Sequence, residues 1–171
     1  MDITKLKRVK LLLLDVDGVL TDGCIIYNDN GSETKIFNVK DGLGIRMLMK
    51  ADIKVGIVTG RVSKALYHRC NNLGISLIFD GIHEKSSVLN LISEQTGLHA
   101  EEIAFIGDDV VDLPLLRKVG LSIAVADAHE TVIDNVNMVT LKKGGHGAVR
   151  EVCDAILKAQ GHWNKIYKQY W

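Results

Sequence analysis

Short apolar runs alternate with amphipathic stretches along most of the chain. Strand-like runs occur at 9–15, 54–60, 75–81, 102–109 and 121–128, with a weaker one at 137–141. Helical stretches lie between them at 41–51, 62–73, 84–96, 110–119 and 147–160. Runs that are apolar on both faces are typical of buried parallel strands covered by helices. The pattern therefore predicts a Rossmann-like, three-layer α/β/α fold with a mostly parallel sheet.

One segment interrupts this alternation. Residues 24–39 read as two β-rich stretches around "NDNG", which is a good hairpin turn, inserted between the first strand and the first helix. No linker or repeat marks a second domain, so we expect one domain over residues 1–171 with a short tail at 162–171. Glycines follow four helical stretches and are expected to cap them: Gly74, Gly97, Gly120 and Gly161.

Composition narrows the class of protein. The chain has 21 basic and 21 acidic residues, so its net charge gives no reason to expect a nucleic acid or a membrane as partner. Three widely spaced cysteines fit reduced thiols in a cytoplasm. The basic N-terminus carries only a short apolar run that ends in acids, which argues against a secretory or membrane-spanning segment. We therefore expect a cytoplasmic protein.

Polar residues follow several of the predicted strands. Asp15 and Asp17 end the first run, Thr59 the second, and Asp108 with Asp109 the fourth. Because ligands of open α/β sheets bind outside the carboxyl ends of the strands, these side chains should converge. In an extended chain Asp15 and Asp17 point the same way, and clustered carboxylates need a cation. Oxygen ligands without histidine or cysteine favour Mg²⁺.

At this point the sequence resembles the haloacid dehalogenase superfamily. The stretches that carry the resemblance are "DVDGVLTDG", "VTGR" at 58–61, Lys85 and "GDDVVD" at 107–112, in the order and on the elements of that superfamily. The resemblance implies an Mg²⁺-dependent phosphatase that works through an aspartyl-phosphate. The hairpin at 24–39 occupies the place of the cap domain that many members carry.

The resemblance also implies a role for each motif residue. Asp15 is the expected nucleophile, and Asp17 the general acid and then the base. Thr59 and Lys85 are expected to bind the transferring phosphoryl group. The metal site is expected to consist of Asp15, Asp17 (by its main-chain carbonyl) and Asp108, with Asp109 and Asp112 supporting it from behind.

Finer resemblance points to the capless phosphatases of 3-deoxy-D-manno-octulosonate 8-phosphate (KDO 8-phosphate), which act in lipopolysaccharide biosynthesis. It rests on four stretches: 37–46, 59–75, 120–129 and 144–161. That family forms homotetramers in which the hairpins associate and neighbouring subunits help to close each site. The expected substrate contacts are Asn38, Val39, Lys40, Asp41, Gly42, Arg46, Arg61 and Arg69, with Lys85. Arginines suit an acid that bears both carboxylate and phosphate.

Some features leave alternatives open. Lys40 and His146 stand where relatives often have arginine, and "KKGGHGAVRE" can be a plain loop and helix start or a substrate-side segment. The aromatic and basic tail at 162–171 can be an ordinary packing surface or a segment that docks on a neighbouring subunit. The substrate can instead be a nine-carbon sialic-acid-type sugar acid phosphate. A non-catalytic phosphate-responsive regulatory domain is a further reading, but every superfamily motif residue is intact. In a response-regulator receiver, by contrast, the acidic and threonine-bearing strands come in a different order.

Overall fold

All six predicted strands pair in parallel in the computed structural model, which describes residues 2–168. The sheet has the order β5-β4-β1-β6-β7-β8. Its strands are β1 (Leu11–Leu14), β4 (Lys54–Val58), β5 (Leu77–Phe79), β6 (Ile103–Gly107), β7 (Leu121–Ala124) and β8 (Met138–Val139). The central β1 pairs with β4 on one side and β6 on the other, so the strand order reverses beside it. In open α/β sheets this reversal is where ligands bind.

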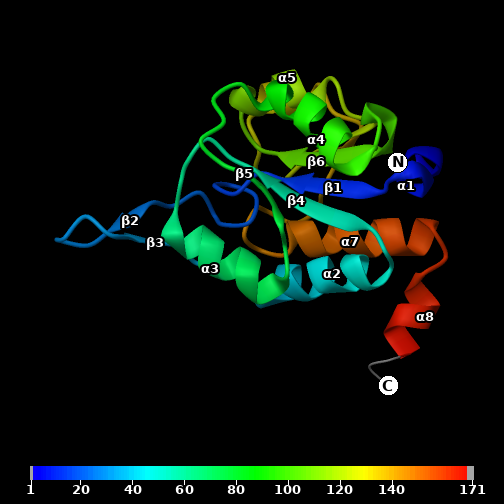
Figure 1. Ribbon diagram of the computed structural model, residues 1–171, viewed down its shortest axis with the longest axis horizontal. Helices are drawn as coiled ribbons and strands as arrows, with labels where there is room; N and C mark the ends of the chain where they lie inside the picture. The colour runs from blue at the N-terminus through cyan, green and yellow to red at the C-terminus, as the bar shows by residue number, and fades with distance from the viewer. Residues whose placement is uncertain (1, 169–171) are drawn as a thin grey trace.

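Helices cover both faces of the sheet, which confirms the predicted three layers (Figure 1). On one face lie α2 (Val39–Lys50), α3 (Lys64–Leu73) and α7 (Ala148–Ala159), and on the other α4 (Val88–Thr96) and α5 (Leu113–Leu116). Helix α2 begins where the Asn38 side chain accepts a hydrogen bond from the Lys40 amide at 2.8 Å. It buries Ile45 and Leu48 against the core.

Several short elements were not predicted because too few residues carry their pattern. They are α1 (Ile3–Arg8), α6 (Glu130–Ile133), α8 (Trp163–Tyr167) and the 3₁₀ turn η2 (Ala100–Glu102). The 3₁₀ turns η1 (Lys85–Ser87) and η3 (Val110–Asp112) lie at the start of the predicted helical stretches 84–96 and 110–119. Helix α8 belongs to the predicted tail and packs on its own chain. Its Ile166 is buried, and Lys158 lies over the ring of Trp163. Residues 169–171 of the tail lie outside the described residues.

The glycine predictions divide. Gly74 and Gly97 end their helices in the left-handed conformation, with φ of 84° and 70°. The prediction for Gly120 was wrong, because α5 already ends at Leu116 and Gly120 does not have positive φ. What position 120 requires is space, since a Cβ there would lie 2.3 Å from the carbonyl oxygen of Glu101.

The predicted hairpin is present. It consists of β2 (Ile26–Tyr27) and β3 (Glu33–Thr34), which pair antiparallel around a turn where the Gly31 amide donates to the Asn28 carbonyl at 2.8 Å. The hairpin projects beyond the carboxyl ends of the sheet strands (Figure 1). None of the helices within residues 2–168 is both long and apolar enough to cross a membrane.

Strand β1 is the centre of the core, and its four leucines have no exposed surface. Replacing Leu12 by alanine should lower the free energy of unfolding by about 2–5 kcal/mol, because the buried side chain leaves a cavity. Leu141 is 88% exposed, so Leu141→Ala should change it by less than about 0.5 kcal/mol. Denaturant titrations of both variants measure this difference, and equal effects would contradict the assignment of β1 as the core strand.

Candidate active site

The loops that follow β1, β4, β5 and β6 surround a cleft of about 270 Å³ at the carboxyl ends of the strands. Seven predicted site residues line it together: Asp15, Asp17, Thr59, Arg61, Lys85, Asp108 and Asp109. Ile82, His83 and Val111 line it as well and were not predicted. A larger hollow of about 500 Å³ lies at the amino ends of β4 and β5, away from these residues.

A buried lysine holds two carboxylates at the base of the cleft. The Lys85 ammonium lies 2.7 Å from Asp15 Oδ1 and 2.5 Å from Asp112 Oδ1. Burial opposes the charge of Lys85, but the two carboxylates outweigh it and raise the lysine pKa. Lys85 is therefore a fixed positive charge beside Asp15 at the base of the cleft.

Asp112 fixes the turn after β6. It has no exposed surface, and its Oδ2 accepts hydrogen bonds from the amides of Asp108 at 2.9 Å and Asp109 at 3.3 Å. With Oδ1 bound to Lys85, both of its oxygens are engaged. Asp109 is exposed and accepts from the Val110 amide at 2.7 Å. Both residues thus shape the loop that presents Asp108.

The carboxylates of Asp15, Asp108 and Asp112 lie close together, with one oxygen of each within 4.8 Å of the others. Burial, with the charge of Asp112 adding to it against Lys85, raises the pKa of Asp15 to about 6. Burial and the charges of Asp15 and Asp112 raise the pKa of Asp108 to about 8. Crowded oxygen donors without histidine or cysteine fit Mg²⁺. Asp15 and Asp108 can each offer a carboxylate oxygen to the ion, whereas both oxygens of Asp112 are already engaged by Lys85 and the loop amides.

The backbone comes close to this cluster at Gly18. Its φ is 93°, and a Cβ at this position would lie 2.1 Å from Asp108 Oδ2, so only glycine fits. Thr59 is buried on the other side of the cleft. Its Oγ1 accepts from the Arg61 amide at 3.3 Å, which leaves the hydroxyl hydrogen free to donate to a ligand.

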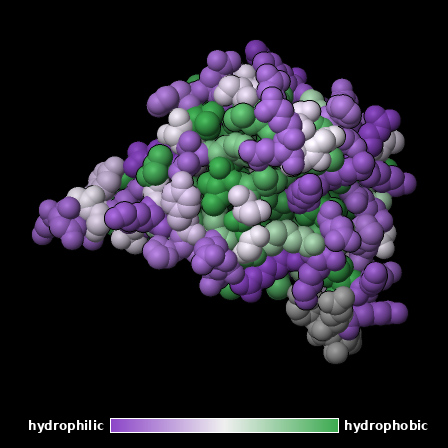
Figure 2. Space-filling view, viewed as in Figure 1, coloured by the Kyte–Doolittle hydropathy of each residue, from purple (hydrophilic) through white to green (hydrophobic). Residues whose placement is uncertain are grey.

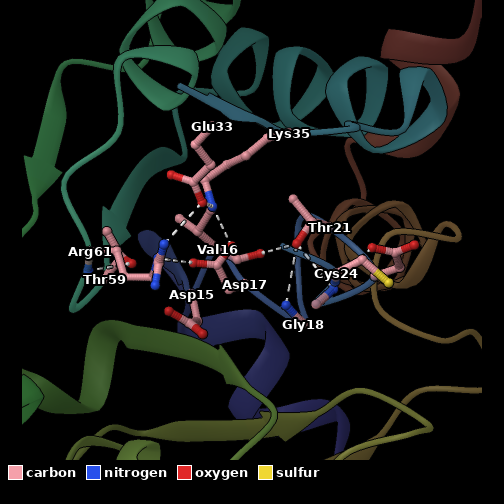
Figure 3. Close-up of polar contacts among 12 residues, drawn as sticks. Asp15, Val16, Asp17, Gly18, Thr21, Cys24, Glu33, Lys35, Thr59 and Arg61 are labelled. Atoms are coloured by element: carbon pink, nitrogen blue, oxygen red, sulfur yellow. Dashed lines mark hydrogen bonds and ion pairs between the residues drawn. The ribbon is translucent and has the colours of Figure 1, made fainter. Parts of the chain in front are cut away.

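The hairpin reaches over the other acid of the first motif (Figure 3). Lys35 forms a hydrogen-bonded ion pair with Asp17, and lies 3.0 Å from Glu33 Oε1. Glu33 lies 3.2 Å from an Arg61 nitrogen, which also donates to the Tyr27 hydroxyl at 3.0 Å. Tyr27, Glu33 and Lys35 of the hairpin were not among the predicted site residues. The available signal was the spacing of Glu33 and Lys35, which places both on one face of a strand.

Other predicted substrate residues lie elsewhere. Val39, Lys40, Gly42, Arg46 and Arg69 line a separate groove of about 340 Å³ between α2 and α3. There Arg46 donates to the Asn72 carbonyl at 2.5 Å and Arg69 to the Asn38 carbonyl at 3.0 Å. Within one chain, the structure therefore does not bring these residues to the carboxylates.

Two predicted residues and the glycine-rich segment connect α2 to the loop after β1. The buried Asp41 accepts from the Arg150 amide at 2.8 Å, at the start of α7. Asn38 donates to the Gly145 carbonyl at 3.1 Å, and the Gly145 amide donates to Val19 at 2.9 Å. The segment around His146 is thus a loop and helix start that packs on the loop carrying Asp17.

Comparisons with known proteins agree with this geometry. Residues 77–152 match the family model described as haloacid dehalogenase-like hydrolase. The chain is 48% identical over 159 residues, 93% of its length, to the 3-deoxy-D-manno-octulosonate 8-phosphate phosphatase of Escherichia coli, 85% of which it covers.

Two solved structures are also similar. The phosphatase of the same name from Yersinia pestis matches with a TM-score of 0.93 and 46% identity, covering 95% of this chain and 88% of that one. The Moraxella catarrhalis enzyme, solved with a magnesium ion, a phosphate ion and KDO, matches with a TM-score of 0.96 and 41% identity. This match covers 99% of the present chain and 97% of the Moraxella catarrhalis chain.

Mg²⁺ should stabilise the folded protein, because it compensates the crowded carboxylates. At 100 times its dissociation constant, the free energy of unfolding should rise by about 2.7 kcal/mol. Asp108→Asn should abolish this rise. At pH 9 without metal, where both Asp15 and Asp108 are ionised, the same variant should melt at a higher temperature than the unmodified protein. Thermal melts with Mg²⁺ and with chelator measure both effects, and an undiminished rise in Asp108→Asn would exclude this site.

Proposed function

The chain belongs to the haloacid dehalogenase-like hydrolases and, among them, to the 3-deoxy-D-manno-octulosonate 8-phosphate phosphatases. On this premise we propose that it hydrolyses KDO 8-phosphate to KDO and phosphate with Mg²⁺, in lipopolysaccharide biosynthesis. The observation that carries the proposal is the buried contact of Asp15 with Lys85 beside Asp108, at the carboxyl end of the central strand. These residues bring a nucleophile, a cation and a metal-binding carboxylate together in one cleft.

In the first step an oxygen of Asp15 bonds to phosphorus, and the bond from phosphorus to the sugar oxygen breaks. Asp17 gives its proton to that oxygen, so KDO leaves as a neutral alcohol. The product on the protein is an aspartyl-phosphate at Asp15. Since Asp15 and Asp17 line the same cleft, one phosphate ester can reach both.

In the second step water attacks the phosphorus of the aspartyl-phosphate. Asp17, now a carboxylate, takes the proton of that water, and the bond from phosphorus to Asp15 breaks. Phosphate is released and both acids return to their starting states. Each carboxylate thus has one role, Asp15 in bond formation and Asp17 in proton transfer.

The surroundings of Asp15 lower the cost of bringing it to a phosphate dianion. Lys85 and the Thr59 hydroxyl are placed to bind the phosphoryl oxygens. When bound by Asp15, Asp108 and the main chain of Asp17, Mg²⁺ supplies further positive charge to the phosphoryl group. Asp109 and Asp112 keep the Asp108 loop in place.

Arg61 is the residue of this cleft that we assign to the substrate carboxylate. Its planar guanidinium suits a carboxylate, and it already holds the carboxylate of Glu33. The remaining predicted contacts, from Asn38 to Gly42 with Arg46 and Arg69, stay a prediction. The predicted contacts that line the groove between α2 and α3 can reach the substrate only if a second subunit contributes them or the groove moves.

Phosphate release from a panel of phosphorylated sugar acids with Mg²⁺ tests the function. The eight-carbon KDO 8-phosphate should be the preferred substrate, and Asp15→Asn should lose activity by at least about 10⁴-fold because it lacks the nucleophile. Asp29 lies exposed in the hairpin turn, so Asp29→Asn is the matched control and should keep full activity.

The outcomes separate the alternatives. Preference for a nine-carbon sialic-acid-type phosphate would overturn the substrate while keeping the chemistry. Full activity of Asp15→Asn would overturn the mechanism. Phosphate binding without hydrolysis of any ester in the panel would favour the regulatory reading instead.

We also propose that the chain forms a homotetramer through its hairpins. Ile25 and Ile36 of the hairpin segment are 47% and 65% exposed, and apolar side chains gather on the face over β4 and β5 (Figure 2). The double variant Ile25→Asp/Ile36→Asp should sediment as a smaller species than the unmodified protein. Leu141→Asp, at another exposed aliphatic side chain, should leave the assembly unchanged. A fully active monomer of the unmodified chain would refute a shared site.

A further inference from the structure

Lys35 is the most buried charged side chain of the hairpin. Its side chain is only 2% exposed, although most of the hairpin segment 24–39 is exposed. A buried ammonium is costly unless it is paired. Both of its partners are acids, Asp17 from the loop after β1 and Glu33 from strand β3, which ends one residue before Lys35. The hairpin is therefore attached to the cleft by the buried Lys35 ammonium, which is paired with these two acids.

The contact is specific for one oxygen of Asp17. Lys35 holds Oδ1, whereas Oδ2 is buried and accepts no hydrogen bond from the described residues. The Nε of Arg61 lies 3.6 Å from Oδ2 and likewise has no hydrogen-bond partner among them. One oxygen is thus held by Lys35, and the other has no hydrogen-bond partner among the described residues.

Glu33 and Tyr27 make this arrangement rigid. Glu33 bridges Lys35 and Arg61, and although burial opposes ionisation of Glu33, those two cations lower its pKa. The Tyr27 hydroxyl accepts from Arg61, which connects the other strand of the hairpin to the same group. Figure 3 shows Glu33 and Lys35 extending together toward Asp17 and Arg61.

We propose that Lys35 is a positioning residue, which fixes the Asp17 carboxylate by one oxygen so that the other meets the leaving-group oxygen of the substrate. This inference rests on the proposed role of Asp17 in proton transfer. The hairpin is then part of the catalytic apparatus of its own chain, besides any part in assembly. Proton transfer depends on such orientation, and a misplacement of about 1 Å can cost about 100-fold in rate.

Two substrates with different leaving groups test this. The sugar alkoxide of KDO 8-phosphate is strongly basic and needs a proton, whereas p-nitrophenolate leaves without one. Lys35→Met should lower kcat/KM for KDO 8-phosphate by about 10- to 100-fold, mainly through kcat, but for p-nitrophenyl phosphate by less than about threefold. Lys35→Arg keeps a cation at this place, serves as the second variant, and should recover part of the lost rate.

Controls separate this inference from the function on which it rests. Lys64→Met removes an exposed lysine at the start of α3 and should affect neither substrate. Asp17→Asn should show the same selective loss of kcat/KM as Lys35→Met, but a larger one, because kcat/KM reports the first step and not the hydrolysis of the aspartyl-phosphate that both substrates share. If Asp17→Asn lowers kcat/KM for both substrates equally, the role of Asp17 as the acid for the leaving group is wrong. The positioning role of Lys35 is overturned if Asp17→Asn is selective but the folded Lys35 variants are not. In that case their kcat/KM falls equally for both substrates or for neither.

Discussion

The structure depends on the repulsion between carboxylates that are gathered at the end of a buried strand. Asp15, Asp108 and Asp112 lie within a few ångströms of one another, and the ammonium of Lys85 is in contact with two of them. One ammonium does not balance three carboxylates, and burial, with repulsion between the acids, raises the pKa values of Asp15 and Asp108. The fold can keep this arrangement because the six-stranded sheet and its two helical layers supply the burial energy.

Sheet register is what brings the acids together. Leu14 lies opposite Ile106, and the Asp15 amide donates to the Ile106 carbonyl at 3.0 Å. Asp15 and Asp108 therefore leave two paired strands at nearly the same level. Residues 93 positions apart in the chain meet because β1 and β6 are neighbours at the point where the strand order reverses. Any slip of this register would separate them.

This explains what the sequence could predict. Apolar runs and the acids that end them are local patterns, so the sheet and the convergence of Asp15, Thr59 and Asp108 could be foreseen. The orientation of the hairpin over the cleft could not, because it is determined by ion pairs between residues such as Lys35 and Asp17, far apart in the pattern. The same limit applies to Arg46 and Arg69, whose placement depends on how α2 packs against α3.

The cleft contains two groups of charges with different balances. When Asp17 is ionised, as it is between the two steps, Asp17, Glu33, Lys35 and Arg61 contribute two negative and two positive charges and form a neutral group that connects hairpin and loop. Asp15, Asp108, Asp112 and Lys85 contribute three negative charges and one positive, which leaves a deficit of two when all are ionised. One divalent cation matches that deficit. The Asp17 carboxylate is balanced by cations of the hairpin and of Arg61 rather than by the metal. Proton transfer and neutralisation of the clustered carboxylates are therefore carried out by neighbouring but separate groups. The hairpin thus holds the carboxylate that transfers protons, which the sheet alone does not do.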